Sequence, residues 1–212
     1  MQHVDHTSGP MWLEWARQLQ AIAQTGLAFC QTDYDRQRYT KCQQIAAQIV
    51  ASHTDLPIDQ VQSGFSAQPG YATVKVDVRG AVIQDGRILL VQERRDQRWC
   101  MPGGWADVGD RPSEMVKREV WEESGLQVEP TKVIGVFDAN RGNQPLEFYH
   151  AYKIVFLCRI TGGQIRCSDE TMAAGFFDFD ALPELSAERT NHRHLQEVRA
   201  HLLDPYRPAA FD

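Results

Sequence analysis

Apolar side chains in the first seventy residues recur at the spacing of one helix face. Intervals of three or four residues between apolar positions are typical of an amphipathic α-helix. We predict a helix over 11–25 that ends near Gly26, a second from about 33 to 52, and a short third one from Leu56-Pro57 to about Gly64. The apolar positions of the first helix are Trp12, Trp15, Leu19 and Ile22.

From residue 73 onward the pattern becomes that of β-strands. Valines at positions 74, 76 and 78 alternate with charged residues, which is the period of a half-buried strand. The apolar runs 81–83 and 87–91 flank Gln84-Asp85-Gly86 and predict a β-hairpin. Later apolar runs predict three strands and a final helix, at 132–137, 149–159, 175–178 and about 191–203.

This change of pattern divides the chain into two parts. Gln68-Pro69-Gly70-Tyr71 is typical of a linker, so we expect residues 1–70 to form a helical N-terminal domain and residues 71–212 an α/β domain. A segment as small as 1–70 buries little apolar area alone. Its aromatic side chains need a partner surface, either on the rest of the chain or on a second copy, and we expect a homodimer.

The composition is that of a soluble protein, with 42% apolar and 24% charged residues. The apolar runs are too short to span a membrane, and residues 1–10 lack the apolar core of a signal peptide. Five scattered cysteines without metal-ligand spacing indicate reduced thiols and a cytoplasmic protein. A formal charge of −6 makes nucleic acid an unfavoured partner but permits a small anionic substrate, because a bound divalent cation dominates the local field.

Three glutamates are spaced so that they share one face of a short helix. Glu119, Glu122 and Glu123 stand at i, i+3 and i+4, within roughly 100° of one another around a helix axis. Like charges at i,i+4 destabilise a helix by roughly 0.2–0.5 kcal/mol per pair. The cluster therefore contributes nothing to folding unless a cation binds among the side chains. An oxygen-only site of this kind suits Mg²⁺ or Mn²⁺.

The residues around these acids support a helix between two loops. Gly103 and Gly104 allow the backbone to approach a ligand closely, and Pro112 is favourable in the first turn of a helix. Arg118 is spaced to pair with carboxylates on the helix and in the loop before it. Gly125 is typical of the position just after a helix end. A solvated acidic helix is the simpler alternative, but it explains neither the glycines nor the spacing.

Residues 104–126 resemble the Nudix box, Gly-x5-Glu-x7-Arg-Glu-U-x-Glu-Glu-x-Gly-U, in which U is bulky and apolar. The segment departs from it at Asp110, where the family has Glu; in the family this acid mostly braces the box arginine. The resemblance implies a mixed β-sheet sandwiched between helices. Four short segments are also similar to a bacterial Nudix subgroup with a helical N-terminal domain: Trp-Leu-Glu-Trp-Ala (12–16), Gln-Thr-Gly-Leu (24–27), Lys-Val-Asp-Val-Arg-Gly (75–80) and Leu-Pro-Glu-Leu-Ser (182–186).

The resemblance implies hydrolysis of the pyrophosphate bond of a nucleoside diphosphate linked to another group. ADP-ribose and CDP-choline are the substrates associated with the subgroup. It also implies metal ligands: Glu119 and Glu123 directly, Glu122 directly or through water, and the carbonyl oxygen of Gly103. Arg118 supports the catalytic acids.

The resemblance leaves the general base open between an acid of a later loop and a glutamate of the box. The loop before the strand at 175–178 offers Glu170 first and Asp169 second, while Glu122 is the alternative within the box. A non-catalytic nucleotide sensor is a competing interpretation, although the intact glutamates disfavour it. Substrate contacts are expected from side chains near the box, each of which is by itself more often structural or solvated: Arg79, Arg94, Trp105 and Tyr149.

Overall fold

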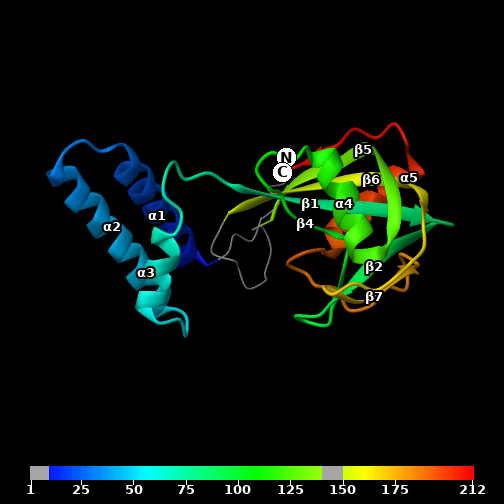
Figure 1. The fold of residues 1–212 in the computed structure, drawn as a ribbon, viewed down its shortest axis with the longest axis horizontal. Coiled ribbons are helices and arrows are strands. Elements are labelled where there is room, and N and C mark those ends of the chain that lie inside the picture. Colours follow the sequence, from blue (N-terminus) through cyan, green and yellow to red (C-terminus); the bar gives the residue numbers. More distant parts are fainter. Residues whose placement is uncertain (1–9, 140–149) are drawn as a thin grey trace, which may run out of the picture. The chain divides into compact units, whose positions relative to one another are not determined.

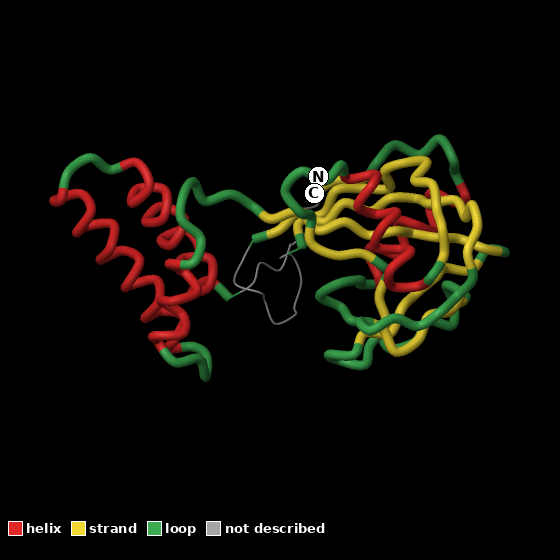
Figure 2. The backbone as a smooth tube through the Cα atoms, viewed as in Figure 1, coloured by secondary structure: helices red, strands yellow, loops and turns green. Residues whose placement is uncertain are grey.

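The structure, a computed structural model, describes residues 10–139 and 150–212. The chain separates into two compact units, with the boundary between Val74 and Lys75 (Figure 1). Figure 2 shows helices alone in the first unit and all the strands in the second. None of the helices in the described residues has the length and apolar character needed to cross a membrane.

The first unit contains the three helices that the apolar spacing predicted. These are α1 (Met11–Phe29), α2 (Asp33–Ser52) and α3 (Ile58–Ser66). The side chain of Thr32 caps α2 by accepting a hydrogen bond from the Asp35 N–H at 3.1 Å. A small core lies between the helices and consists of Ala16, Ala46, Ala47, Val50, Val61 and Phe65.

The first helix does not end near Gly26 as predicted, but continues to Phe29. Gly26 is required for packing instead of termination. A Cβ atom at this position would lie 2.4 Å from the ring of Tyr39 on α2, so the glycine lets the ring rest directly on the α1 backbone. The sequence suggested a helix end at this glycine because the ring that it contacts belongs to another helix, and local sequence does not reveal that contact.

The second unit is built on a mixed sheet in the order β3-β2-β1-β6-β5-β8, with β4 also paired to β1 and β7 to β2. Parallel pairing joins β1 to β6 and β5 to β8, and the other pairs are antiparallel. The strands are β1 (Lys75–Gln84), β2 (Arg87–Glu93), β3 (Trp99–Cys100), β4 (Gly103–Trp105), β5 (Leu126–Asp138), β6 (Ala151–Gly163), β7 (Thr171–Phe177) and β8 (Ala210–Phe211).

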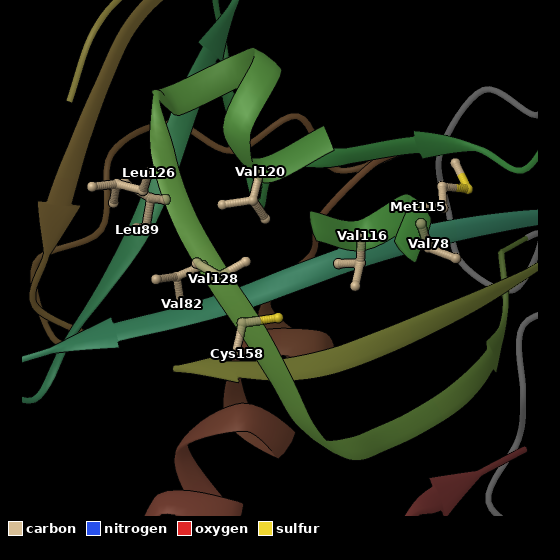
Figure 3. Close-up of a cluster of buried hydrophobic side chains, with 9 residues drawn as sticks. All are labelled: Val78, Val82, Leu89, Met115, Val116, Val120, Leu126, Val128 and Cys158. Carbon is tan, nitrogen blue, oxygen red and sulfur yellow. The ribbon is translucent and has the colours of Figure 1, made fainter. Parts of the chain in front are cut away.

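Helices cover both faces of this sheet. Successive residues of a strand point to opposite faces: Val78 and Val82 of β1 pack with α4 (Pro112–Ser124), whereas Ala81 packs with α5 (His192–Leu203). In Figure 1, α4 lies in front of the sheet and α5 behind it. The side chains under α4 come from α4, β1, β2, β5 and β6 (Figure 3). The predicted fold class, a mixed sheet between helices after a helical segment, is therefore confirmed.

The hairpin between β1 and β2 also agrees with the sequence. Asp85 and Gly86 both have positive φ angles, 52° and 75°, as the favoured two-residue hairpin turn requires. The strand predicted at 132–137 begins earlier, because the chain leaves the helix at Gly125 and enters β5 at once. The short strands β3, β4 and β8 were not predicted, since two or three residues carry no detectable alternation.

Candidate active site

The acidic helix α4 has the ends that its sequence predicted. Pro112 occupies the first turn, where its missing N–H has no intrahelical partner to lose. Gly125 ends the helix with a φ of 78°, and its N–H donates to the Trp121 carbonyl at 2.8 Å. The three glutamates therefore lie in the last two turns of α4, close to the point where the chain enters β5.

The apolar side of α4 determines the direction of the acidic side. Val116 and Val120 are fully buried against β1 (Figure 3). The helix lies so close to that strand that a Cβ atom on Gly80 would meet Val120 at 2.6 Å. Glu119 and Glu123 lie directly beside this buried face on the helix, so packing of the valines on the sheet brings both acids to Gly103 and Gly104 of β4.

Glu123 is the most buried of the three acids, with 5% of its surface exposed. Its Oε2 accepts a hydrogen bond from the Gly103 N–H at 2.9 Å. Burial raises the pKa of the Glu123 carboxyl to about 8, against the opposing effects of Arg79 and of the Gly103 hydrogen bond. A carboxylate buried with so little compensation gains stability from a cation.

The backbone at Gly103 explains why its N–H is available to Glu123. Hydrogen bonds from Gly80 N to Pro102 O and from Ala106 N to Val76 O, each 2.8 Å, put Gly103 in a non-hydrogen-bonded pair with Arg79. Only glycine fits there, because φ is 144° and a Cβ atom would lie 2.0 Å from the Val78 carbonyl oxygen.

The other two glutamates are progressively more exposed. The side chain of Glu119 is 15% exposed and that of Glu122 is 49% exposed. Burial raises the pKa of Glu119. Gly104 leaves room for this acid, since a Cβ atom there would lie 3.0 Å from the Glu119 Oε2. The spacing i, i+3, i+4 therefore produces a graded set of acids, from buried to exposed.

Arg118 lies among these acids and connects the helix to the preceding loop. Its Nη1 donates to Asp110 at 2.6 Å and its Nη2 to Asp107 at 3.3 Å. The same guanidinium is 3.4 Å from Glu119 and 4.0 Å from Glu122. The hydrogen bond to Asp110 is the largest cause of the raised pKa of Arg118. Asp110 thus contacts the arginine despite being one methylene shorter than glutamate.

The donor atoms of the site fit a hard divalent cation. Glu119, Glu122 and Glu123 provide only carboxylate oxygens, which are the ligands that Mg²⁺ and Mn²⁺ prefer. In the described part of the chain, no three His, Cys, Asp or Glu side chains are already grouped as metal ligands. The positive charge among the acids in this structure is that of Arg118.

The loop before β7 is tied to the end of α4. The Thr171 hydroxyl, which is fully buried, donates to the Glu123 carbonyl at 2.9 Å, and the Arg166 N–H donates to the Ser124 carbonyl at 2.9 Å. Glu170 is exposed and directly precedes Thr171. Its backbone is therefore one residue from a direct contact with the helix that carries the acids. The sequence analysis did not identify Thr171, because nothing local distinguishes it from other strand residues.

The predicted substrate-contacting residues differ in their exposure and in their contacts. Arg94 is exposed, and its Nη2 donates to the Ser168 carbonyl at 3.2 Å, on the same loop as Glu170. Trp105 is 46% exposed at the end of β4. Tyr149 lies outside the described residues.

Arg79 has surroundings that the sequence did not indicate. It is 5% exposed, and its guanidinium donates to Asp77 and to the Met101 carbonyl. Asp77 and Arg79 both lie on a strand face that is covered by other side chains, so protein groups hold the guanidinium. The predicted contact of Arg79 with substrate stays a prediction. Lys153 of β6 is a third buried charge beside them, and it was also missed.

Comparison with known proteins agrees with this architecture. Residues 10–65 match the family model of the UDP-X-like, N-terminal oligomerisation domain, and residues 74–198 match that of the NUDIX domain. A Bacillus subtilis (strain 168) protein, provisionally named ADP-ribose pyrophosphatase YjhB, is 39% identical over 201 residues, which cover 95% of this chain and 97% of that protein.

Two solved structures extend the comparison. A UDP-X diphosphatase is 28% identical with a TM-score of 0.61, and the match covers 95% of this chain and 98% of that one. An ADP-ribose pyrophosphatase from Streptococcus suis 89-1591 is 37% identical with a TM-score of 0.60, covering 66% of this chain and 100% of that one. The mixed sheet and the acidic helix are those of a hydrolase fold. The chain belongs to the Nudix hydrolase family.

Proposed function

We propose that the protein is a Mg²⁺- or Mn²⁺-dependent pyrophosphatase that cleaves a nucleoside diphosphate linked to a second group, such as ADP-ribose, CDP-choline or a UDP derivative. Products are a nucleoside monophosphate and a phosphorylated remainder. The buried carboxyl group of Glu123, held by the Gly103 N–H at 2.9 Å, is the observation that carries the proposal. Burying an ionised carboxylate there costs stability that a bound cation recovers.

In this proposal the box residues hold the cation and keep its ligands in place. Glu119 and Glu123 are the direct ligands, Glu122 binds directly or through water, and the Gly103 carbonyl is a further oxygen donor. Arg118 orients the loop through its hydrogen bond to Asp110. The bound cation supplies neutralisation of the phosphate charge and a more acidic water.

The proposed general base is Glu170, which accepts the proton of the attacking water. The hydrogen bonds from Thr171 and Arg166 to the end of α4 support this role, since they hold the loop beside the acidic helix. A base must come within hydrogen-bonding distance of the water, and Glu170 is exposed and has room to do so. Glu122 is the competing candidate, because it is the most exposed box glutamate.

Substrate recognition is assigned to side chains around the same loops. Arg94 reaches the loop that carries Glu170, where a guanidinium can bind phosphate oxygens. Trp105 offers an exposed ring for stacking on a base, and Tyr149 remains a further candidate. The ADP-ribose and UDP-X names of the similar proteins support nucleoside diphosphates as the substrate class.

The N-terminal helices are proposed to form a homodimer. One side of α1 exposes apolar side chains four to seven residues apart, as in helices that pair along a seam. The family description of residues 10–65 as an oligomerisation domain supports this assignment. Analytical ultracentrifugation should give about twice the chain mass of 24.1 kDa, and a monomer at micromolar concentration contradicts the proposal. The exposed side chains are Met11, Trp15, Ile22 and Phe29.

A substrate panel at fixed Mg²⁺ tests the function. CDP-choline, ADP-ribose, a UDP-sugar, NADH, FAD and diadenosine polyphosphates are incubated with the protein, and the products are identified by phosphorus NMR. Hydrolysis of at least one diphosphate by the wild type, and not by Glu123→Gln, is expected. Nucleotide binding by calorimetry without hydrolysis of any member would favour the non-catalytic sensor.

A further inference from the structure

Three charged side chains are buried together on one face of the sheet. Asp77 and Arg79 of β1 are each 5% exposed, and Lys153 of β6 is 1% exposed. Asp77 and Arg79 are two residues apart and therefore point to the same face. Lys153 is the register partner of Asp77 across the parallel pair β1 and β6, so all three groups meet beneath the sheet edge that carries β4.

Asp77 connects the two cations of this cluster. Its Oδ2 accepts hydrogen bonds from Nε and Nη2 of Arg79, both at 3.3 Å, and forms an ion pair with the Lys153 ammonium. Its Oδ1 is 3.0 Å from the Arg79 Nε, an ion-pair contact and not a hydrogen bond. Burial lowers the pKa of Arg79, but the charge of Asp77 and its hydrogen bond raise it by more, so the pKa lies above its usual value and the guanidinium stays positive.

A buried cluster of this kind is weak evidence for stability, because removing charges from water costs several kcal/mol per ion. The one acid also does not neutralise both cations. Arg79 also donates outside the cluster, since its Nη1 donates to the Met101 carbonyl at 3.2 Å and to the Cys100 Sγ at 3.9 Å. The cluster is therefore connected to the backbone between β3 and β4.

That backbone segment leads directly to Glu123. The Met101 N–H donates to the buried Thr190 hydroxyl at 2.9 Å, so Met101 is held on both its N–H and its carbonyl. Two residues later, the Gly103 N–H donates to the Glu123 carboxyl at 2.9 Å. Arg79 itself lies opposite Gly103 in the pairing of β1 with β4. A short chain of contacts thus joins Arg79 to the buried acid.

We propose that Arg79 is a positioning residue for Glu123: held by Asp77, it fixes the Met101 carbonyl and thereby the Gly103 N–H that orients the Glu123 carboxylate. It acts through the backbone and does not touch the substrate. Lys153 balances the charge of Asp77 and has no link to the segment. The effect of Arg79 on the orientation of Glu123 does not depend on the proposed function. The effect of that orientation on metal binding does rest on the proposed function.

Two substitutions form a matched pair for the test. Arg79→Met and Lys153→Met each remove one buried cation, keep a long apolar side chain, and leave Asp77 paired with the remaining cation. Both should therefore fold, as checked by thermal melts and circular dichroism. Only Arg79→Met removes the donor to the Met101 carbonyl. It also removes a charge that lowers the pKa of Glu123, so the positioning contact is read from the Gly103 backbone, and Lys153→Met controls for the loss of a buried cation.

The first measurement is the amide resonance of Gly103 in metal-free protein. A hydrogen bond to a carboxyl oxygen moves an amide proton downfield. In Arg79→Met the Gly103 resonance should move upfield and its protection from hydrogen exchange should fall about tenfold, which corresponds to about 1.4 kcal/mol. In Lys153→Met both should remain near wild-type values. A Gly103 resonance that is unchanged in folded Arg79→Met, or equally changed in both variants, overturns the proposal.

The second measurement is Mn²⁺ binding, followed by electron paramagnetic resonance without substrate. Arg79→Met should weaken binding about tenfold, and Lys153→Met by less than about threefold. Weaker Mn²⁺ binding together with no hydrolysis by the wild type would retain the positioning role and reject the proposed activity. Wild-type Mn²⁺ affinity in Arg79→Met, with an active wild-type enzyme, would reject the positioning role alone.

Discussion

Replacing Glu123 by Gln gives two measurable effects of opposite sign. Gln retains an oxygen that can accept the Gly103 N–H but carries no charge. Glu123 has its pKa raised from an ordinary 4.5 to about 8 by burial. In metal-free protein the folded state therefore keeps this proton while the unfolded chain loses it. The contribution of the protonated Glu123 to wild-type stability is then complete below about pH 4.5 and is lost as pH rises through 8.

The size of this effect follows from the pKa interval. Each unit corresponds to about 1.36 kcal/mol, so between pH 5 and 8 the wild type should lose on the order of 4 kcal/mol relative to Glu123→Gln. Urea unfolding of the full chain in EDTA, followed by circular dichroism at several pH values, measures the difference. A difference that is constant from pH 5 to 8 would refute the argument that an uncompensated carboxyl group is buried at this position.

Metal addition reverses the comparison. A cation that binds only the folded wild type stabilises it by about 2.7 kcal/mol at a hundred times its dissociation constant. Glu123→Gln lacks the charge and should gain little, and its turnover should fall by at least about 100-fold. The same protein pair therefore reports on burial without metal and on catalysis with it. Equal stabilisation of both proteins by Mg²⁺ would mean that the cation binds elsewhere.

Four further substitutions test three separate parts of the structure. Arg118→Lys keeps the charge but removes the forked guanidinium that reaches the acids of the loop and of the helix. We therefore expect kcat to fall about 10- to 100-fold in steady-state assays. A wild-type kcat would show that the guanidinium is dispensable. Glu170→Gln should lower kcat about 100-fold or more with Mn²⁺ affinity unchanged, whereas Asp169→Asn should keep most of the activity; the reverse ranking would move the base. Gly26→Ala gains about 1 kcal/mol in helix propensity. The contact of 2.4 Å between the new Cβ atom and the Tyr39 ring should nevertheless lower the free energy of unfolding by about 1–3 kcal/mol in total. A higher melting temperature of the helical unit would contradict the close packing.

Local features of this protein were determined by its sequence. These features depend on residues that are close together in the sequence. They are the helices α2 and α4, the hairpin at Asp85-Gly86 and the contact of Arg118 with Asp110. Periodicity and end signals record such features directly, because the interacting groups are close in sequence. The spacing of the box glutamates belongs to the same class.

Tertiary structure alone decided how the acids differ and what lies beneath them. Glu123 is buried because the apolar side of α4 packs on β1 and brings the last turn against Gly103, about twenty residues away in the chain. Asp77, the partner of Arg79, also pairs with Lys153 because β6 lies beside β1, and Gly26 packs under a ring from another helix. Burial and charge pairing of this kind depend on which distant segments meet, and the local pattern of apolar and polar positions does not carry that information.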